Sequence, residues 1–77
     1  MAKYPTGYDL RQLRQDRGLT QGAVAVLAGI TNVEVSLLER GKVSPQPATI
    51  VKLAKGLGIG AERMRDILAA SRDGNAA

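Results

Sequence analysis

The sequence contains neither cysteine nor histidine, and these two absences exclude several kinds of site. Without cysteine there is no disulfide framework and no thiol nucleophile, and without either residue there is no Cys/His zinc site and no histidine base. We therefore expect neither a metal nor a cofactor. A chain of 77 residues buries only about 60% of the surface exposed when it is unfolded, so packing alone must hold a compact core.

Aromatic residues and long apolar runs are also scarce. The only aromatic residues are Tyr4 and Tyr8, too few to form the platform on which single-strand and RNA readers stack unpaired bases. No apolar run approaches the roughly 20 residues of a membrane span, and the N-terminus lacks the apolar stretch of a signal peptide. We therefore expect a cytoplasmic protein with no membrane partner, and a nucleic-acid partner would be a duplex.

Basic residues outnumber acidic ones by 11 to 7, which gives a net charge of +4 and a pI of about 10.0. This balance suits a protein that approaches phosphates, although many small proteins carry such a charge for solubility. The carboxylates show no paired spacing beyond ordinary helix faces, and no phosphate-cradling loop or nucleophile elbow is present. We therefore expect that the chain is not an enzyme and has no small-molecule substrate.

Glycines and capping residues divide the chain into segments with helical spacing, and none alternates with a period of two residues. A first helix follows an approximate capping box of Thr6 and Asp9, carries Leu10 and Leu13 on one face, and stops at Gly18. Four further helices are expected from Thr20 to Gly29, from Thr31 to Gly41, and over about 47–56 and 61–71.

The resulting prediction is an all-α, compact five-helix domain that comprises residues 1–77. Two prolines make the segment 42–47 a stiff, extended link between the third and fourth helices. Residues 1–5 and 72–77 are expected to be flexible.

The most informative stretch is about 20–41, where two short helices are expected to cross at a steep angle. Ala25 is small where the helices approach, Gly29 permits a positive φ in the turn, and three apolar residues bury the inner side, namely Ile30, Val35 and Leu38. The other face of the second of these helices then points outward. It carries Asn32, Val33, Ser36 and Leu37.

From about Leu10 to Ile59 the chain resembles the Cro/repressor, or XRE-like, helix-turn-helix family. The matching segments are Leu-Arg-Gln-Leu-Arg at 10–14, Arg-Gly-Leu-Thr-Gln at 17–21, Ala-Gly-Ile-Thr at 28–31, Val-Ser at 35–36, Leu-Glu-Arg-Gly-Lys at 38–42 and Leu-Ala-Lys at 53–55. The resemblance implies a lambda-repressor-like domain of phage or bacterial origin. It also implies a double-stranded DNA operator as partner, bound by a homodimer.

The resemblance further implies roles for individual residues. Phosphate contacts would come from Gln21, which would also brace the recognition helix, and from Arg40 and Lys42. The base-facing residues would be Thr31, Asn32, Val33, Ser36 and Leu37. An internal ion pair would join Arg14 to Glu39. These base-facing positions are physically reasonable because an Asn can pair with adenine and a Val can contact a thymine methyl, each good pair giving about 1–3 kcal/mol.

Each of these roles has a simpler alternative. Gln21 and Asn32 can be ordinary polar residues in the first turn of a helix, and cations at the end of a helix are favoured by its dipole whatever the function. Arg14 and Glu39 can be separate surface charges. Glu34 would repel phosphate unless it accepts a hydrogen bond from cytosine N4. Gly22 either permits close approach of the DNA backbone or has no such role.

Four apolar residues, Val26, Leu27, Val33 and Leu37, stand where related domains commonly carry polar side chains. They can read thymine methyls, pack against the last helix, or bind a protein partner. The leading hypothesis is therefore a repressor or Cro-like regulator, and the alternative is a protein-interaction module on the same scaffold, such as an antirepressor or antitoxin. Met64, Ile67 and Leu68 of the last helix are expected either at a dimer interface or in the monomer core.

Overall fold

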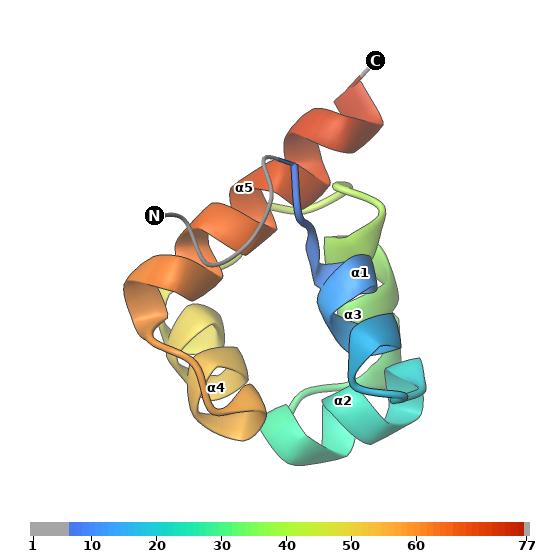
Figure 1. Cartoon of the computed structure of the whole chain (residues 1–77), viewed down its shortest axis with the longest axis vertical. Coiled ribbons are helices and arrows are strands. Elements are labelled where there is room, and N and C mark those ends of the chain that lie inside the picture. Colours follow the sequence, from blue (N-terminus) through green and yellow to red (C-terminus); the bar gives the residue numbers. More distant parts are fainter. Residues whose placement is uncertain (1–6, 77) are drawn as a thin grey trace.

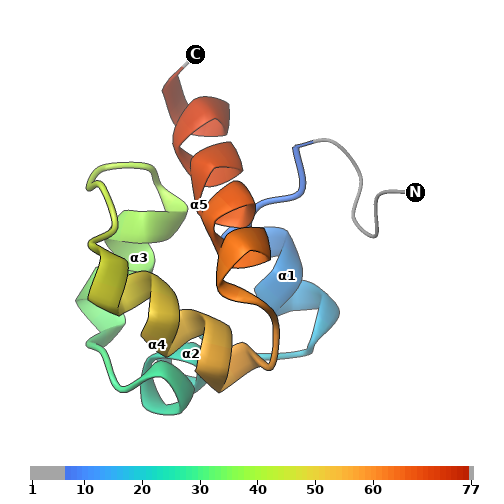
Figure 2. The same cartoon turned by 90° about the vertical axis from the view of Figure 1, so that its left-hand side faces the viewer.

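Five helices make up the part of the chain that the structure, a computed structural model, describes, which is residues 7–76, with side chains as far as Arg72. They are α1 (Leu10–Asp16), α2 (Gln21–Ala28), α3 (Asn32–Glu39), α4 (Pro47–Leu57) and α5 (Ala61–Ala76). No strand occurs among residues 7–76, so the prediction of an all-α, five-helix domain is confirmed. Figures 1 and 2 show the helices arranged around a common centre.

Local capping signals fix most of the helix boundaries. The hydroxyl oxygens of Thr20 and Thr31 accept hydrogen bonds from backbone N–H groups in the first turns of α2 and α3, each at 3.0 Å. At the other end of α2, Gly29 has a φ of 70°, a left-handed conformation that glycine adopts without a steric penalty. These three boundaries agree with the sequence prediction.

The predicted start of α1 is wrong. The N-cap is Asp9, whose side chain accepts from the backbone N–H of Gln12 at 2.9 Å, while the Gln12 side chain accepts from the Asp9 N–H at 3.3 Å. The capping box therefore lies three residues later than expected, because the pair Asp9–Gln12 satisfies two of the N–H groups that this helix end leaves unpaired. Thr6 lies outside the described residues, as do residues 1–5, which were expected to be flexible.

The predicted end of α5 is also wrong, because the helix continues to Ala76 instead of ending near residue 71. Ser71 is fully buried, and its hydroxyl donates to the Ile67 carbonyl at 3.2 Å and accepts from the Leu10 N–H at 3.0 Å. Ser71 thus joins α5 to the first turn of α1. This contact fixes the part of α5 near residue 71, where the helix was expected to end.

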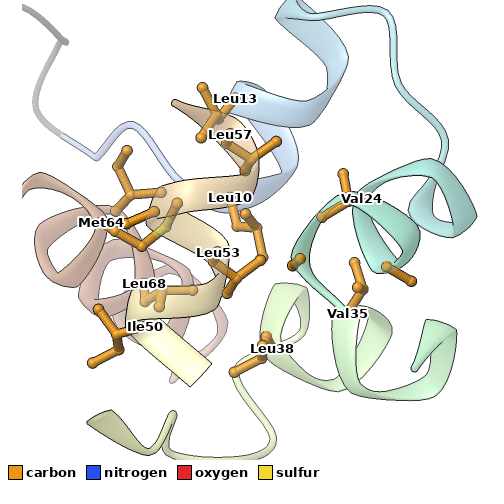
Figure 3. Close-up of a cluster of buried hydrophobic side chains, with 14 residues drawn as sticks. Leu10, Leu13, Val24, Val35, Leu38, Ile50, Leu53, Leu57, Met64 and Leu68 are labelled. Atoms are coloured by element: carbon orange, nitrogen blue, oxygen red, sulfur yellow. The ribbon is translucent and has the colours of Figure 1, made fainter. Parts of the chain in front are cut away.

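A single apolar core fills the space between the helices. Figure 3 shows side chains from all five helices meeting there, with those of α4 in the middle. Met64, Ile67 and Leu68 are at most 2% exposed, so they complete the monomer core. The interpretation of these three side chains as a dimer surface is therefore wrong, because α5 turns them inward against α4, α3 and α1.

Candidate nucleic-acid interface

The corner between α2 and α3 sets the direction of the outer face of α3. The two helices are bent by 112° across the turn at Gly29 and Ile30, and the Ile30 N–H donates to the Ala25 carbonyl at 3.0 Å to close it. Ala25 and Val35 are buried where the pair meets the core. Figure 2 shows α3 at the outer side of the molecule, beside the link to α4. The expected steep crossing of two short helices is therefore present.

None of the helices in residues 7–76 is both long enough and apolar enough to cross a membrane. Only α2 and α3 taken together pass such a test, and their bend divides them into two short pieces.

The outer face of α3 contains four of the predicted base-facing residues. In the first turn, Asn32 is exposed and Val33 is 67% exposed, whereas Ser36 and Leu37, one turn later, are half-buried. Residues four apart share one face of a helix, so these four side chains form two adjacent rows. Val35 and Leu38 point into the core on the opposite side.

The fifth predicted base-facing residue, Thr31, is engaged in a capping box with Glu34. A carboxylate oxygen of Glu34 accepts from the Thr31 N–H at 3.1 Å and from its hydroxyl at 3.2 Å, while the Thr31 hydroxyl oxygen accepts from the Glu34 N–H. This structural role of Glu34 was missed, although the spacing Thr-x-x-Glu signals it. The cap fixes the start of α3 and therefore the position of Asn32 and Val33.

A hydrogen-bonded network of three residues links α1, α2 and α3. Arg14 Nε donates to Glu39 Oε2 at 2.6 Å and Arg14 Nη2 to Glu39 Oε1 at 3.2 Å. Gln21 Nε2 donates to Glu39 Oε1 at 3.1 Å. The predicted ion pair and the bracing contact of Gln21 are thus confirmed, and the phosphate role of Gln21 stays a prediction.

The ion pair is shielded from water, since the Glu39 side chain is 4% exposed and that of Arg14 is 14% exposed. The hydrogen bond with Glu39, aided by its charge, raises the pKa of the Arg14 guanidinium, and burial only partly opposes this effect. Arg14 also donates to the Leu19 carbonyl at 3.1 Å. The two hydrogen bonds between the Arg14 guanidinium and the Glu39 carboxylate hold the end of α3 against α1.

Comparison with known proteins identifies the family. A family model described as a helix-turn-helix domain matches residues 7–67. The chain belongs to this helix-turn-helix family. It is a family of transcription regulators and not of enzymes, in agreement with the sequence prediction.

Several bacterial helix-turn-helix regulators are similar to this chain. The uncharacterized HTH-type transcriptional regulator RghRB of Bacillus subtilis is 44% identical over 61 residues, which is 78% of this chain and 44% of that protein. The HTH-type transcriptional repressor RghR of the same organism is 44% identical over 54 residues, 69% of this chain and 40% of RghR. The HTH-type transcriptional regulator PuuR of Escherichia coli is 42% identical over 53 residues, 69% of this chain and 29% of PuuR. The chain thus spans less than half the length of these relatives. No solved structure matches.

The basic residues expected to clamp phosphates lie at the C-terminal end of the helix-turn-helix unit. Arg40 and Lys42 are both exposed, and Arg40 Nε donates to the Ser36 carbonyl at 3.4 Å. The Lys42 N–H donates to the Leu37 carbonyl at 3.0 Å, which holds the backbone of the turn against α3. These two residues are therefore close to the two rows on the outer face of α3.

Two apolar residues of α2 lie away from these rows. Val26 is 83% exposed and Leu27 is 50% exposed, so the idea that they pack against the last helix is wrong. Val26 falls opposite the inner stripe of α2, which faces α3 and α4, and Leu27 lies at the edge of that stripe.

Proposed function

We propose that this chain is a sequence-specific DNA-binding transcriptional regulator, with α3 as the helix that enters the major groove. The observation that carries the proposal is the exposed first turn of α3, where Asn32 and Val33 project from a helix start fixed by the Thr31–Glu34 cap. A recognition helix is read from its N-terminal half. The side chains there, an amide and a branched alkyl group, suit adenine and the thymine methyl.

Phosphate contacts in this proposal come from Gln21, Arg40 and Lys42. Gln21 opens α2, where backbone N–H groups and the helix dipole favour an anion. Its bond to Glu39 uses one of the two amide hydrogens, which leaves the other for a phosphate oxygen. Arg40 and Lys42 flank the far end of α3.

The biological role that we propose is that of a repressor or Cro-like regulator that occupies an operator as a homodimer. Support comes from the resemblance to the Cro/repressor family and from the relative RghR, which is named a transcriptional repressor. Since Met64, Ile67 and Leu68 are used by the core, the proposed dimer must use other residues. Sedimentation of the free protein and of its DNA complex tests the dimer independently of DNA recognition.

The test of DNA recognition is selection of bound sequences from a random duplex pool, followed by titration of the selected site and of random duplex against salt. We expect an enriched motif and a linear fall of log affinity with log salt concentration. Absence of binding to any duplex would overturn the proposal. It would favour the alternative of a protein-interaction module, for which the 67% exposure of Val33 is the supporting observation.

A further inference from the structure

A polar hollow of about 420 Å³ opens beside the Arg14–Glu39–Gln21 network, between three helices. Arg11 comes from α1, Gln21 from the start of α2, and Ser36 and Arg40 from the outer side and end of α3. The remaining lining residues are Asp9, Arg14 and Glu39. The sequence analysis did not assign a function to Arg11.

The two carboxylates of this hollow are already occupied by donors from the protein. Glu39 binds the Arg14 guanidinium and the Gln21 amide. Asp9 accepts from the Gln12 N–H as the N-cap of α1. The charge of Arg14 is balanced by Glu39. Arg11 and Arg40 outweigh the single remaining carboxylate, that of Asp9, so three arginines against two carboxylates leave the hollow with a net charge of +1.

Several donors of the hollow, by contrast, have no acceptor among the described residues. Arg11 is exposed and makes no hydrogen bond or ion pair there, and the Ser36 hydroxyl likewise has no partner in that part of the chain. Arg40 uses only its Nε, in the bond to the Ser36 carbonyl, and Gln21 uses one amide hydrogen. Such a set of donors fits a ligand that only accepts hydrogen bonds and carries negative charge.

We infer that this hollow binds one phosphodiester group of the DNA backbone, with Arg11 and Arg40 as its two cations and Gln21 and Ser36 as neutral donors. The inference rests on the proposed function and adds to it a contact from α1, outside the helix-turn-helix unit. Continuity supports DNA as the source of the phosphate, because Ser36 lies both in the hollow and on the proposed major-groove face of α3, and Arg40 follows at the end of that helix. A phosphate held from three helices fixes the protein's register on the duplex without reading its sequence.

The test compares Arg11→Gln with the matched control Arg65→Gln, since Arg65 is an exposed arginine on α5 that does not line the hollow. Duplex binding is titrated against salt for both variants and the unchanged protein, after thermal unfolding has confirmed that the variants fold. We expect Arg11→Gln to weaken selected and random duplexes alike and to reduce the salt slope by about one unit, with Arg65→Gln unchanged. Equal slopes for Arg11→Gln and the unchanged protein would overturn the inference while leaving DNA binding intact.

A second measurement separates failure of the inference from failure of the proposed function. Inorganic phosphate is titrated into the 15N-labelled protein, and the amide shifts of Arg11, Gln21 and Arg40 are followed. Shifts at these residues that Arg11→Gln removes support an anion site. If they occur without any duplex binding, the phosphodiester inference and the DNA proposal both fail, and free phosphate is the ligand of the hollow. If duplex binds but the Arg11 amide shifts with neither phosphate nor DNA, only the inference fails.

Discussion

Gly56 in α4 lies directly against the backbone of Leu27 in α2. A Cβ atom placed on Gly56 would be 2.5 Å from the Leu27 carbonyl oxygen and 2.7 Å from its carbonyl carbon. Real Cβ atoms essentially never approach another atom so closely, and here the neighbour is a main-chain group that cannot rotate away. The absence of a side chain at Gly56 therefore allows α2 and α4 to pack closely, and this contact holds α2 in place against α4.

We expect Gly56→Ala to lower the free energy of unfolding. The helices must move apart to admit the methyl group, at a cost of about 1–3 kcal/mol, which outweighs the better helix propensity of alanine. Gly22→Ala is the matched control, since its Cβ would meet only the Thr20 hydroxyl at 3.8 Å, an ordinary contact, and α2 should gain up to about 1 kcal/mol. Urea unfolding of both variants checks this, and a Gly56→Ala protein as stable as Gly22→Ala would contradict it.

The buried ion pair leads to a second prediction. Glu39→Met leaves the Arg14 guanidinium and the Gln21 amide without their acceptor, and we expect a loss of about 3 kcal/mol in the free energy of unfolding. The double variant Arg14→Met/Glu39→Met removes both charges and should be less destabilised than the sum of the two single variants, by about 0.5–3 kcal/mol. Strict additivity in a double-mutant cycle would show that the two residues do not interact.

The raised pKa of Arg14 gives this pair a defined pH dependence. A base whose pKa is higher in the folded state contributes stability below its unfolded-state pKa, and this contribution is lost only as the pH rises through the folded-state pKa. Arginine already titrates far above neutral pH, so the stability difference between the unchanged protein and the double variant should stay constant from about pH 6 to about pH 10. A steady decline over that interval would contradict the assignment.

The capping box at the start of α3 predicts different effects for two substitutions of Glu34. Glu34→Ala removes the acceptor for the Thr31 N–H and should cost about 0.5–2 kcal/mol of stability. Glu34→Gln keeps a side-chain oxygen at the same place and should unfold nearly like the unchanged protein. Thermal unfolding distinguishes them. Should both variants prove equally stable, the carboxylate would have no capping role and base discrimination would be its remaining function.

Asn32→Ala tests whether α3 reads bases. The side chain is exposed and has no structural partner among the described residues, so the variant should fold normally. It should weaken binding to the selected operator by about 1–3 kcal/mol and leave random duplex almost unaffected. Lys42→Ala serves as the contrasting control, because loss of a phosphate contact weakens all sequences alike. Equal losses of Asn32→Ala on both duplexes would refute its base-reading role.

The accuracy of the sequence predictions depended on how local the deciding contacts were. Thr20, Gly29 and Thr31 act on backbone groups within a few residues, so their caps and the α2–α3 corner followed from spacing alone. The ion pair of Arg14 with Glu39 spans 25 residues and was predicted only through the family resemblance. The prediction of which residues lie on the outer face of α3 follows from its apolar residues Val35 and Leu38, which mark the buried face.

Other contacts between distant segments escaped prediction. Arg17 donates to the Leu57 carbonyl at 2.7 Å and so satisfies the C-terminal end of α4 from 40 residues away, which no local pattern indicates. Arg11 joins the hollow because α1 lies beside α3, and its position along the chain gives no sign of this. For the same reason, spacing alone did not show whether the apolar face of α5 lies inside the monomer or at a dimer interface.

The hydrogen bond between Leu10 and Ser71 has a consequence for how the protein is made. The two residues are separated by 61 positions, so as the chain leaves the ribosome the first helix is complete long before its hydroxyl partner has been synthesised. Until then the Leu10 amide has only water to bind, and α1 lacks the surface that α5 supplies. Folding of α1 should therefore wait for synthesis of α5, and nascent chains that stop short of residue 71 should be easily cut by proteases within α1.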